Sequence, residues 1–124
     1  MSSHTYYAKL AKKIALDKRK DDNLINWNSI DNNRLIKALM VIRTPDLMRL
    51  FLDDLLTKSE IEQCIRRLHA VELILMGAPY VFVRQSTGLG PSTIARISKQ
   101  LIYKKGGYQE IMDRLHPNGF RYFD

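Results

Sequence analysis

Cysteine is nearly absent from this sequence, whose 124 residues include one, Cys64. A single cysteine excludes an intramolecular disulfide and a zinc site built from several thiolates. Such scarcity is typical of proteins in a reducing compartment, and we therefore expect a cytoplasmic location. Since Cys64 falls on the apolar stripe of a predicted helix, we expect it to be an unreactive thiol in the core.

Long hydrophobic runs are also missing. The apolar stretches are short and interrupted by charged residues, whereas a membrane-spanning helix needs about 20 mostly apolar residues in succession. The N-terminal residues lack the apolar segment of a secretory signal peptide. The sequence therefore predicts neither a membrane span nor export, and we expect no membrane partner.

Signatures of catalysis and of cofactor binding are absent as well. The histidines are His4, His69 and His116, and none belongs to an H-E-x-x-H or H-x-x-E-H metal motif. Asp53 and Asp54 are neighbours, so on a helix their carboxylates point apart and make a poor acid–base pair. No G-x-x-x-x-G-K loop is present to hold a phosphate. We expect a protein that is not an enzyme and that needs neither a metal nor a cofactor.

The sequence does contain enough apolar residues for one folded domain, together with an uneven excess of positive charge. Hydrophobic residues make up 45% of the chain and charged residues 27%, which argues against general disorder. The net charge is +7, and the basic excess lies in residues 1–20 and 77–124, whereas residues 21–76 are slightly acidic. Positive ends suit a polyanion such as DNA, although charge of this size serves solubility equally well.

Apolar residues recur at helical spacing along most of the chain, which predicts an all-α fold. We expect a basic N-terminal helix or arm in residues 1–22, a helical domain in residues 23–116 and a C-terminal tail in residues 117–124. Within the domain, one helix is expected from Asp31 and the next after Thr44, which precedes a proline suited to the first helical position. The residues expected to face inward are Trp27, Leu35, Ile36, Leu39, Met40, Leu47, Leu50, Phe51 and Leu55.

A long helix is predicted after Thr57. Thr57 and Glu60 have the spacing of a capping box, in which each side chain accepts from the backbone amide of the other residue. Gly77 suits the left-handed residue that often follows a helix. The apolar stripe expected to be buried consists of Ile61, Cys64, Ile65, Leu68, Val71 and Leu75, and a last helix is expected to bury Ile111, Met112 and Leu115.

Residues 79–101 have the pattern of a helix-turn-helix. Gly88 allows a sharp turn between two helices. Val83 is placed to anchor the first helix inward, and Ile94 and Ile97, three residues apart, are placed to anchor the second. The four residues that end at Val83 favour a strand by propensity, but the turn that follows them indicates a helix.

The second helix of this unit is expected to present a small, polar and basic tip. Gly90, just before it, is expected to make the entry into this helix more flexible. Hydroxyl groups bond bases or phosphates, arginine pairs with guanine or phosphate, and a helix N-terminus favours phosphate. A structural helix hairpin would share the same spacing, so the pattern alone leaves both interpretations open. The outward polar and basic residues are Ser92, Thr93, Arg96 and Lys99, followed by Lys104 and Lys105.

These segments resemble the tryptophan repressor superfamily, and more closely its YerC/YecD branch, from about Leu55 to Leu115. The first matching segments are Leu55-Leu56-Thr57 with Glu60, and then Arg67-Leu68. The next are Thr87-Gly88 and Ser92-Thr93-Ile94-Ala95-Arg96-Ile97, similar to the family's T-G-x-S-x-A-T-I-S-R-V region. The last are Gly107-Tyr108 and Asp113-Arg114-Leu115, similar to the G-Y…D-R-L ending of that branch. The order and spacing of these motifs together carry the resemblance.

The resemblance implies an intertwined, all-α homodimer that acts as a sequence-specific, repressor-like regulator of transcription. The long helix and its predecessors would build a shared core. The two helix-turn-helix units would enter successive major grooves of double-stranded DNA, about 34–36 Å apart. By position, Pro91, Ser92 and Thr93 would lie near the bases, and Arg84 would touch phosphate.

The resemblance also bears on a possible effector. Arg67 and Arg96 stand where the tryptophan repressor holds its corepressor between two arginines. A glycine follows the second arginine there, whereas this chain has Ile97, whose branched side chain would occupy the space of the indole. We therefore expect that tryptophan is not a ligand. Arg67 and Arg96 could meet another small anion or pair with carboxylates such as Glu72, and any effector is unknown.

Three positions that depart from these patterns favour an alternative function. Arg84 replaces a small residue usual in the branch and must extend outward, and Pro91 replaces a polar residue and lacks an amide donor. Together with Ile97, they favour a helical protein-interaction module of the same fold with lost or non-specific nucleic-acid binding. The aromatic residues of the tail are expected to pack on a partner subunit rather than stack on bases.

Overall fold

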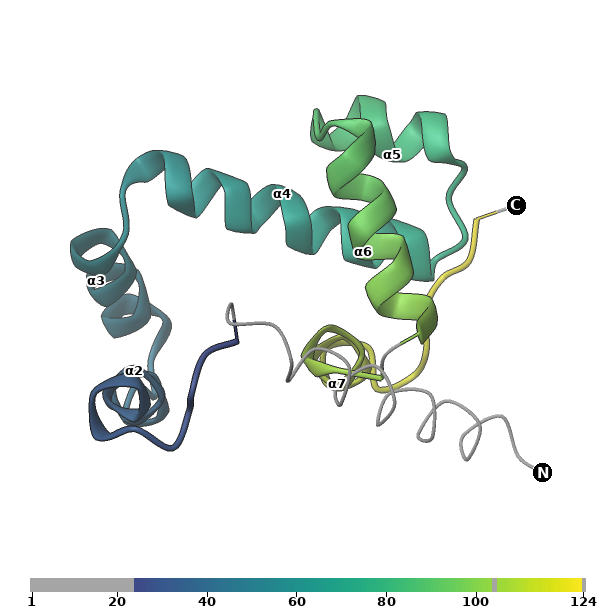
Figure 1. The fold of residues 1–124 in the computed structure, drawn as a ribbon. Coiled ribbons are helices and arrows are strands. Elements are labelled where there is room, and N and C mark those ends of the chain that lie inside the picture. Colours follow the sequence, from purple (N-terminus) through teal and green to yellow (C-terminus); the bar gives the residue numbers. More distant parts are fainter. Residues whose placement is uncertain (1–23, 104, 124) are drawn as a thin grey trace.

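The computed structural model describes residues 24–103 and 105–123, and this part of the chain is all-helical, without strands (Figure 1). The all-α class predicted from the sequence is therefore confirmed. The basic helix predicted in residues 1–22 and the predicted contact Lys104 lie outside the described residues. The helices are α2 (Ile30–Met40), α3 (Pro45–Leu55), α4 (Lys58–Leu75), α5 (Tyr80–Thr87), α6 (Pro91–Tyr103) and α7 (Gly107–Leu115).

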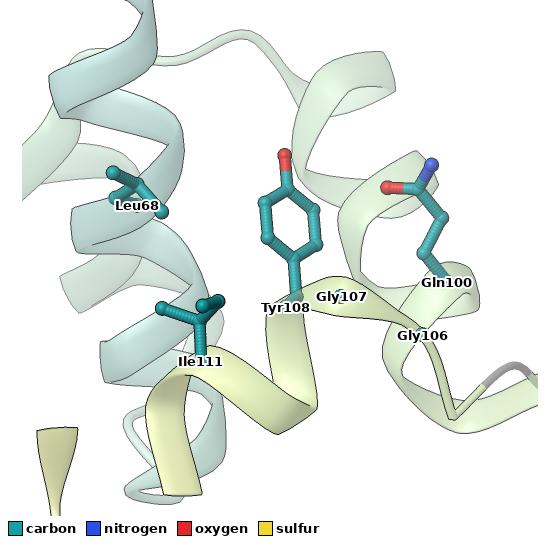
Figure 2. Close-up of a pocket in the computed structure, with 6 residues that line it drawn as sticks. All are labelled: Leu68, Gln100, Gly106, Gly107, Tyr108 and Ile111. Atoms are coloured by element: carbon teal, nitrogen blue, oxygen red, sulfur yellow. The ribbon is translucent and has the colours of Figure 1, made fainter. Parts of the chain in front are cut away.

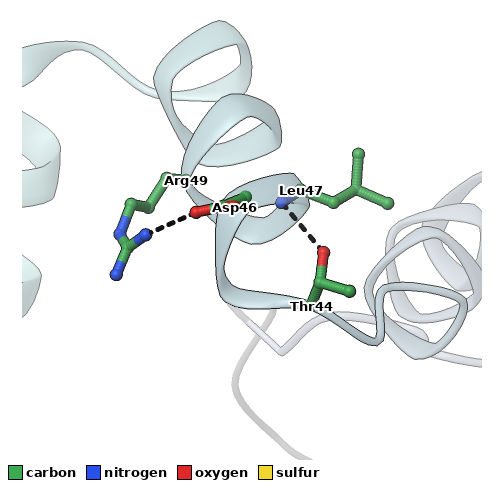
Figure 3. A network of polar contacts seen from close by, with 4 residues as sticks. All are labelled: Thr44, Asp46, Leu47 and Arg49. Atoms are coloured by element: carbon green, nitrogen blue, oxygen red, sulfur yellow. Dashed lines mark hydrogen bonds and ion pairs between the residues drawn. The ribbon is translucent and has the colours of Figure 1, made fainter.

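Side-chain hydroxyls cap the first three of these helices. The hydroxyl of Ser29 accepts a hydrogen bond from an amide in the first turn of α2, which begins one residue earlier than predicted. At α3, the Oγ1 atom of Thr44 accepts from the amide of Leu47 at 3.2 Å, and Asp46 pairs with Arg49 at 2.8 Å (Figure 3). These groups satisfy amides that the helix itself leaves free.

Both ends of α4 have the structure that its sequence predicts. Thr57 and Glu60 form the capping box, with hydrogen bonds of 3.1 and 2.9 Å. The backbone amide of Thr57 donates to the Glu60 carboxylate and lowers the pKa of Glu60. At the other end, Gly77 has φ +82° and donates to the carbonyl of Ile74, while Ala78 donates to that of Leu73. These two bonds form a Schellman motif, which turns the chain sharply toward α5.

The core of the described chain surrounds the C-terminal half of α4. Helices α5, α6 and α7 gather around this half, whereas α2 and α3 lie at the opposite end of α4 (Figure 1). The buried apolar residues come from four helices and the α5–α6 turn: Ala70, Val71, Leu73, Val83, Leu89, Ile94, Ile97 and Met112.

The predicted burial of α2, α3 and the first half of α4 is wrong for the single chain. Helices α2 and α3 contain no buried residue, and Cys64, predicted to lie in the core, is exposed. The physical reason is that no described segment of the same chain covers these apolar faces. The exposed apolar residues that were expected to be buried are Trp27, Leu35, Ile36, Met40, Leu47, Leu50, Leu55, Ile65, Leu68, Ile111 and Leu115.

The segment after α7 folds back onto its own chain. It turns at Gly119, which has φ +85°, and the amide of Phe123 then donates to the carbonyl of Met76 at 2.8 Å. Phe120 and Phe123 pack against the core, while Tyr122 is exposed. The expectation that the tail aromatics would pack on a partner subunit is therefore wrong for the two phenylalanines, since their own chain supplies the apolar surface.

Candidate nucleic-acid interface

The turn between α5 and α6 depends on a left-handed glycine and a buried threonine. Gly88 has φ +69°, a conformation that strains residues with a Cβ, and its amide donates to the carbonyl of Arg84 at 2.9 Å. The hydroxyl of Thr87 donates to the carbonyl of Val83 at 2.7 Å and accepts from the amide of Leu89 at 3.3 Å. The second hydrogen bond spans Gly88, so one side chain joins the end of α5 to the turn.

The anchors of the two helices are buried as predicted, and both helices pack against α4. Val83 on α5 is buried, and so are Ile94 and Ile97 on α6. The segment that begins at Tyr80 is helical, as the turn after it indicated, although its propensity favours a strand. Leu89 in the turn is a further anchor, which the sequence reasoning missed because it lies outside the periodic part of either helix.

The start of α6 is open to solvent. Gly90, Pro91 and Ser92 are exposed, and Thr93 is half-buried. The first turn of α6 contains no acidic residue, and amides in a first helical turn have no acceptor within the helix. This end of the helix therefore has the exposure and the partial positive charge that suit a phosphate or a base edge.

Exposed basic side chains lie on both helices of the unit and just after it. Arg96 and Lys99 are exposed on α6, Arg84 is exposed on α5, as its length requires, and Lys105 is exposed just before α7. Because Ile94 and Ile97 hold the opposite side of α6, Ser92, Arg96 and Lys99 share its outer side, whereas the half-buried Thr93 lies on the flank. The structure thus places Arg84 and the predicted contacts of α6 on the helix-turn-helix surface, and Lys105 shortly after it.

The two arginines considered for an effector have different surroundings. Arg67 on α4 is half-buried, and its Nε atom is buried without a hydrogen-bond partner in the described structure, whereas Arg96 is exposed. Of the two alternatives for these arginines, pairing with Glu72 is not found in the described structure, where the Glu72 carboxylate lies 3.4 Å from the Nε2 atom of His116. Within residues 24–103 and 105–123, the ion pairs include neither arginine.

A cavity of about 470 Å³ lies between α4, α6 and α7. Figure 2 shows the residues that line it, with the ring of Tyr108 standing between the helices and a polar amide supplied by Gln100. Neither Arg67 nor Arg96 belongs to its lining. The sequence does not predict this cavity, because its wall combines residues from three helices and periodicity describes each helix separately. Its lining residues are Leu68, Gln100, Gly106, Gly107, Tyr108 and Ile111.

Two classes of site are not found in the described part of the chain. No group of three or more histidine, cysteine, aspartate or glutamate side chains there could hold a metal ion. No helix of residues 24–103 and 105–123 is both long enough and apolar enough to cross a membrane.

Comparison with known proteins gives consistent matches. The family of the Trp repressor protein matches residues 31–116. The uncharacterised protein YerC of Bacillus subtilis (strain 168) is 26% identical over 83 residues, which cover 67% of this chain and 80% of YerC.

Solved structures share the fold. One is a protein from Staphylococcus aureus provisionally described as a Trp repressor, with a TM-score of 0.69 and 26% identity over 75% of this chain and 93% of that one. Another is a TrpR-like protein from Eubacterium eligens ATCC 27750, with a TM-score of 0.68 and 24% identity over 72% and 92%. The family match covers most of the described residues, from α2 through α7, and includes the turn at Gly88. The chain therefore belongs to the Trp repressor family.

Proposed function

We propose that this protein is a sequence-specific DNA-binding regulator of transcription, of the repressor type. The observation that carries the proposal is α6 itself: its N-terminal tip is exposed and free of acidic residues, its outer side bears Arg96 and Lys99, and its other side is fixed by buried anchors. A helix of this kind enters the major groove and contacts base edges with the residues of its first turns. The role requires no catalytic step, and we propose that it is exercised in the cytoplasm.

The proposed contacts divide into two groups. Ser92 and Thr93 lie at the tip of α6 and contact bases together with Arg96, which can pair with guanine through two hydrogen bonds. The more distant cations bind phosphates and set the register of the protein on the duplex, with no direct part in reading sequence. These cations are Arg84, Lys99, Lys104 and Lys105.

We also propose that the protein acts as a homodimer. Many large apolar residues are exposed on α2, α3 and the first half of α4, and so are Ile111 and Leu115 on α7. Apolar surface gathered on neighbouring helices is typical of a protein–protein interface. A second copy related by a two-fold axis would cover the same residues on both chains. Two α6 tips would then lie about one helical turn of DNA apart, at roughly 34–36 Å.

The dimer is tested by placing a charge on this face. Ile65 is 60% exposed on α4. We expect Ile65→Glu to shift the protein from dimer to monomer in analytical ultracentrifugation, because it would place a carboxylate in an apolar interface. Arg66→Glu introduces the same side chain at the neighbouring exposed position and should stay dimeric. A monomeric wild-type protein would contradict the dimer, and an Ile65→Glu protein that stays dimeric would contradict an interface on this face.

DNA recognition is tested by selecting bound duplexes from a random-sequence library. We expect enrichment of a two-fold symmetric sequence, bound more tightly than the unselected pool by about a thousandfold or more at physiological salt. Equal affinity for every duplex would exclude a sequence-specific regulator. Structured RNA added as a competitor should leave the selected duplex bound.

A second candidate function is a protein-interaction module of the same fold. It is favoured by an apolar patch on the first turn of α5, where Tyr80, Val81 and Phe82 are 47%, 57% and 42% exposed and have no part in the proposed DNA contacts. Pro91 also removes one amide from the tip of α6. A purified dimer that ignores DNA at about 50 mM salt, where phosphate contacts are strongest, would favour this function.

A small anionic effector, if one regulates binding, would contact Arg67 and Arg96. The buried Nε atom of Arg67 supports this proposal, because it has no acceptor in the described structure. Ile97, next to Arg96 on α6, is 2% exposed. Its branched side chain would occupy the space of an indole, which favours a ligand other than tryptophan. Isothermal titration with tryptophan should therefore show no binding.

A further inference from the structure

The segment formed by residues 116–123, here termed the strap, connects the end of α7 to the first helix of the helix-turn-helix. All but its first residue follow the part of the chain that the family matches. The strap begins at the C-terminal cap of α7 and turns at Gly119. It then runs back to the junction between α4 and α5 (Figure 1). The proposed DNA contacts leave this segment without a role.

The strap is attached to α4 at two places. The Nε2 atom of His116 lies 3.4 Å from the carboxylate of Glu72, and the His116 ring lies against Phe120 with a centroid distance of 4.5 Å. Further along, the Phe123 amide donates to the carbonyl of Met76 at 2.8 Å. Met76 caps the C-terminus of α4, so the strap satisfies a carbonyl at the point where the chain leaves α4 for α5.

The strap also contacts α5 directly. The rings of Phe123 and Phe82 meet edge to face, with a centroid distance of 4.8 Å and an interplanar angle of 62°. Phe82 lies in the first turn of α5, whose N-cap residue, Pro79, provides no side-chain hydrogen bond. The buried anchors of this eight-residue helix, Val83 and Thr87, follow Phe82 in the chain. The strap therefore supports the end of α5 that has neither a side-chain cap nor a buried residue of its own.

We propose that the strap fixes the orientation of α5 on α4, and thereby that of the helix-turn-helix, with Phe123 as the positioning residue. The effect of the strap on DNA recognition rests on the proposed DNA-binding function, whereas its support of α5 does not. Because α6 follows α5 after a three-residue turn, a tilt of α5 displaces the tip that meets the groove. A displaced α6 tip loses base contacts before it loses phosphate contacts, because base contacts require stricter geometry.

The test compares Phe123→Ala with Tyr122→Ala in the full-length protein. Tyr122 is the neighbouring ring of the strap and is 69% exposed, which makes it a matched control. We expect Phe123→Ala to speed amide exchange at Val83 and Gly88 by roughly threefold to tenfold, the size expected for losing one edge-to-face aromatic pair. Exchange in the first half of α4 should not change, and Tyr122→Ala should behave as wild type throughout.

Two further measurements separate positioning from general stability. Phe123→Ala should lower the affinity for the selected duplex and leave the affinity for unselected DNA unchanged. Phe123→Leu should restore part of the lost affinity for the selected duplex. If Phe123→Ala fails to fold, Phe82→Ala removes the same aromatic pair from the half-exposed side. Where both single variants fold, the Phe82→Ala/Phe123→Ala double variant should cost less than the sum of the single changes, because the two rings contact each other.

The outcomes distinguish the inference from the function on which it rests. Unchanged amide exchange at Val83 in both phenylalanine variants would contradict the proposal that the strap holds α5. Faster exchange combined with unchanged affinity for the selected duplex would overturn the positioning role. If wild-type protein selects no duplex, the proposed function fails, and the exchange data still decide whether the strap holds α5.

Discussion

Thr87 shows how much one side chain contributes to the helix-turn-helix. Its hydroxyl both donates to α5 and accepts from the turn, and the residue is 5% exposed. Thr87→Val keeps the shape but leaves the Leu89 amide without an acceptor, so we expect the free energy of unfolding to fall by about 1–3 kcal/mol. Urea denaturation measures this change. The exposed neighbour Ser86 provides the control, since Ser86→Ala should alter stability by less than about 0.5 kcal/mol.

Lys99 and Thr93 should differ in what they contribute to DNA binding. Lys99 is exposed on α6, and Lys99→Ala should weaken binding to all duplexes alike and lower the salt slope by about one unit. Thr93→Val should instead change the selected sequence while the slope stays constant. Fluorescence anisotropy titrations at several salt concentrations measure both effects. A changed sequence preference with Lys99→Ala would contradict the division into phosphate and base contacts.

Residue-level prediction from the sequence succeeds where a local rule decides the outcome. Gly88 was predicted because a sharp turn favours a residue without a Cβ, and its positive φ confirms the reason. Thr87 and Phe123 were missed as structural contacts because their roles depend on backbone groups. The Phe123 amide bonds to a carbonyl 47 positions earlier in the chain, and no side-chain pattern encodes such a pairing.

At the scale of the element, the capping box of α4 connects stability to pH. We expect Thr57→Ala to reduce the free energy of unfolding by about 1 kcal/mol at neutral pH, because an amide in the first turn loses its acceptor. The pKa of Glu60 lies below its ordinary value of 4.5, chiefly because the Thr57 backbone amide donates to the carboxylate. The contribution of Glu60 is therefore present above that ordinary value and is lost as the pH falls through the lowered pKa.

Urea denaturation at neutral pH and at roughly pH 3 checks both parts of this prediction. The difference in stability between wild type and Glu60→Ala should shrink as the pH is lowered, because protonation removes the carboxylate that accepts from the Thr57 amide. The cost of Thr57→Ala, which keeps that backbone amide, should change less with pH. Ser59→Ala, one residue inside the exposed first turn, should show no such pH dependence. A Thr57→Ala protein as stable as wild type at neutral pH would contradict the role of the cap.

Helix boundaries were easier to predict than helix surroundings. Thr44, Thr57 and Gly77 act on the nearest backbone groups, so the sequence alone locates the start of α3 and both ends of α4. The stripe on α4 was identified as apolar, yet Ile65 and Leu68 are exposed. Periodicity shows which face of a helix is apolar, but the segment that covers this face depends on tertiary or quaternary structure.

At the scale of the whole molecule, the chain divides its apolar residues between two ends of α4. One end is closed by α5, α6, α7 and the strap, and this is where the core lies. The other end presents α2 and α3 with open apolar faces, which we assign to a second copy. This division explains why the helix-turn-helix could be predicted from one sequence: its anchors Val83, Ile94 and Ile97 are covered by the same chain.

Entry of the α6 tip into the major groove can be tested by attaching a DNA-cleaving iron chelate to Ser92→Cys in a Cys64→Ser background. Ser92 is exposed at the tip, and removing Cys64 leaves a single site for the label. On the selected duplex we predict two clusters of strand cleavage about one helical turn apart, roughly 10 base pairs. Cleavage spread evenly along the duplex, or none from a labelled protein that still binds, would contradict the claim.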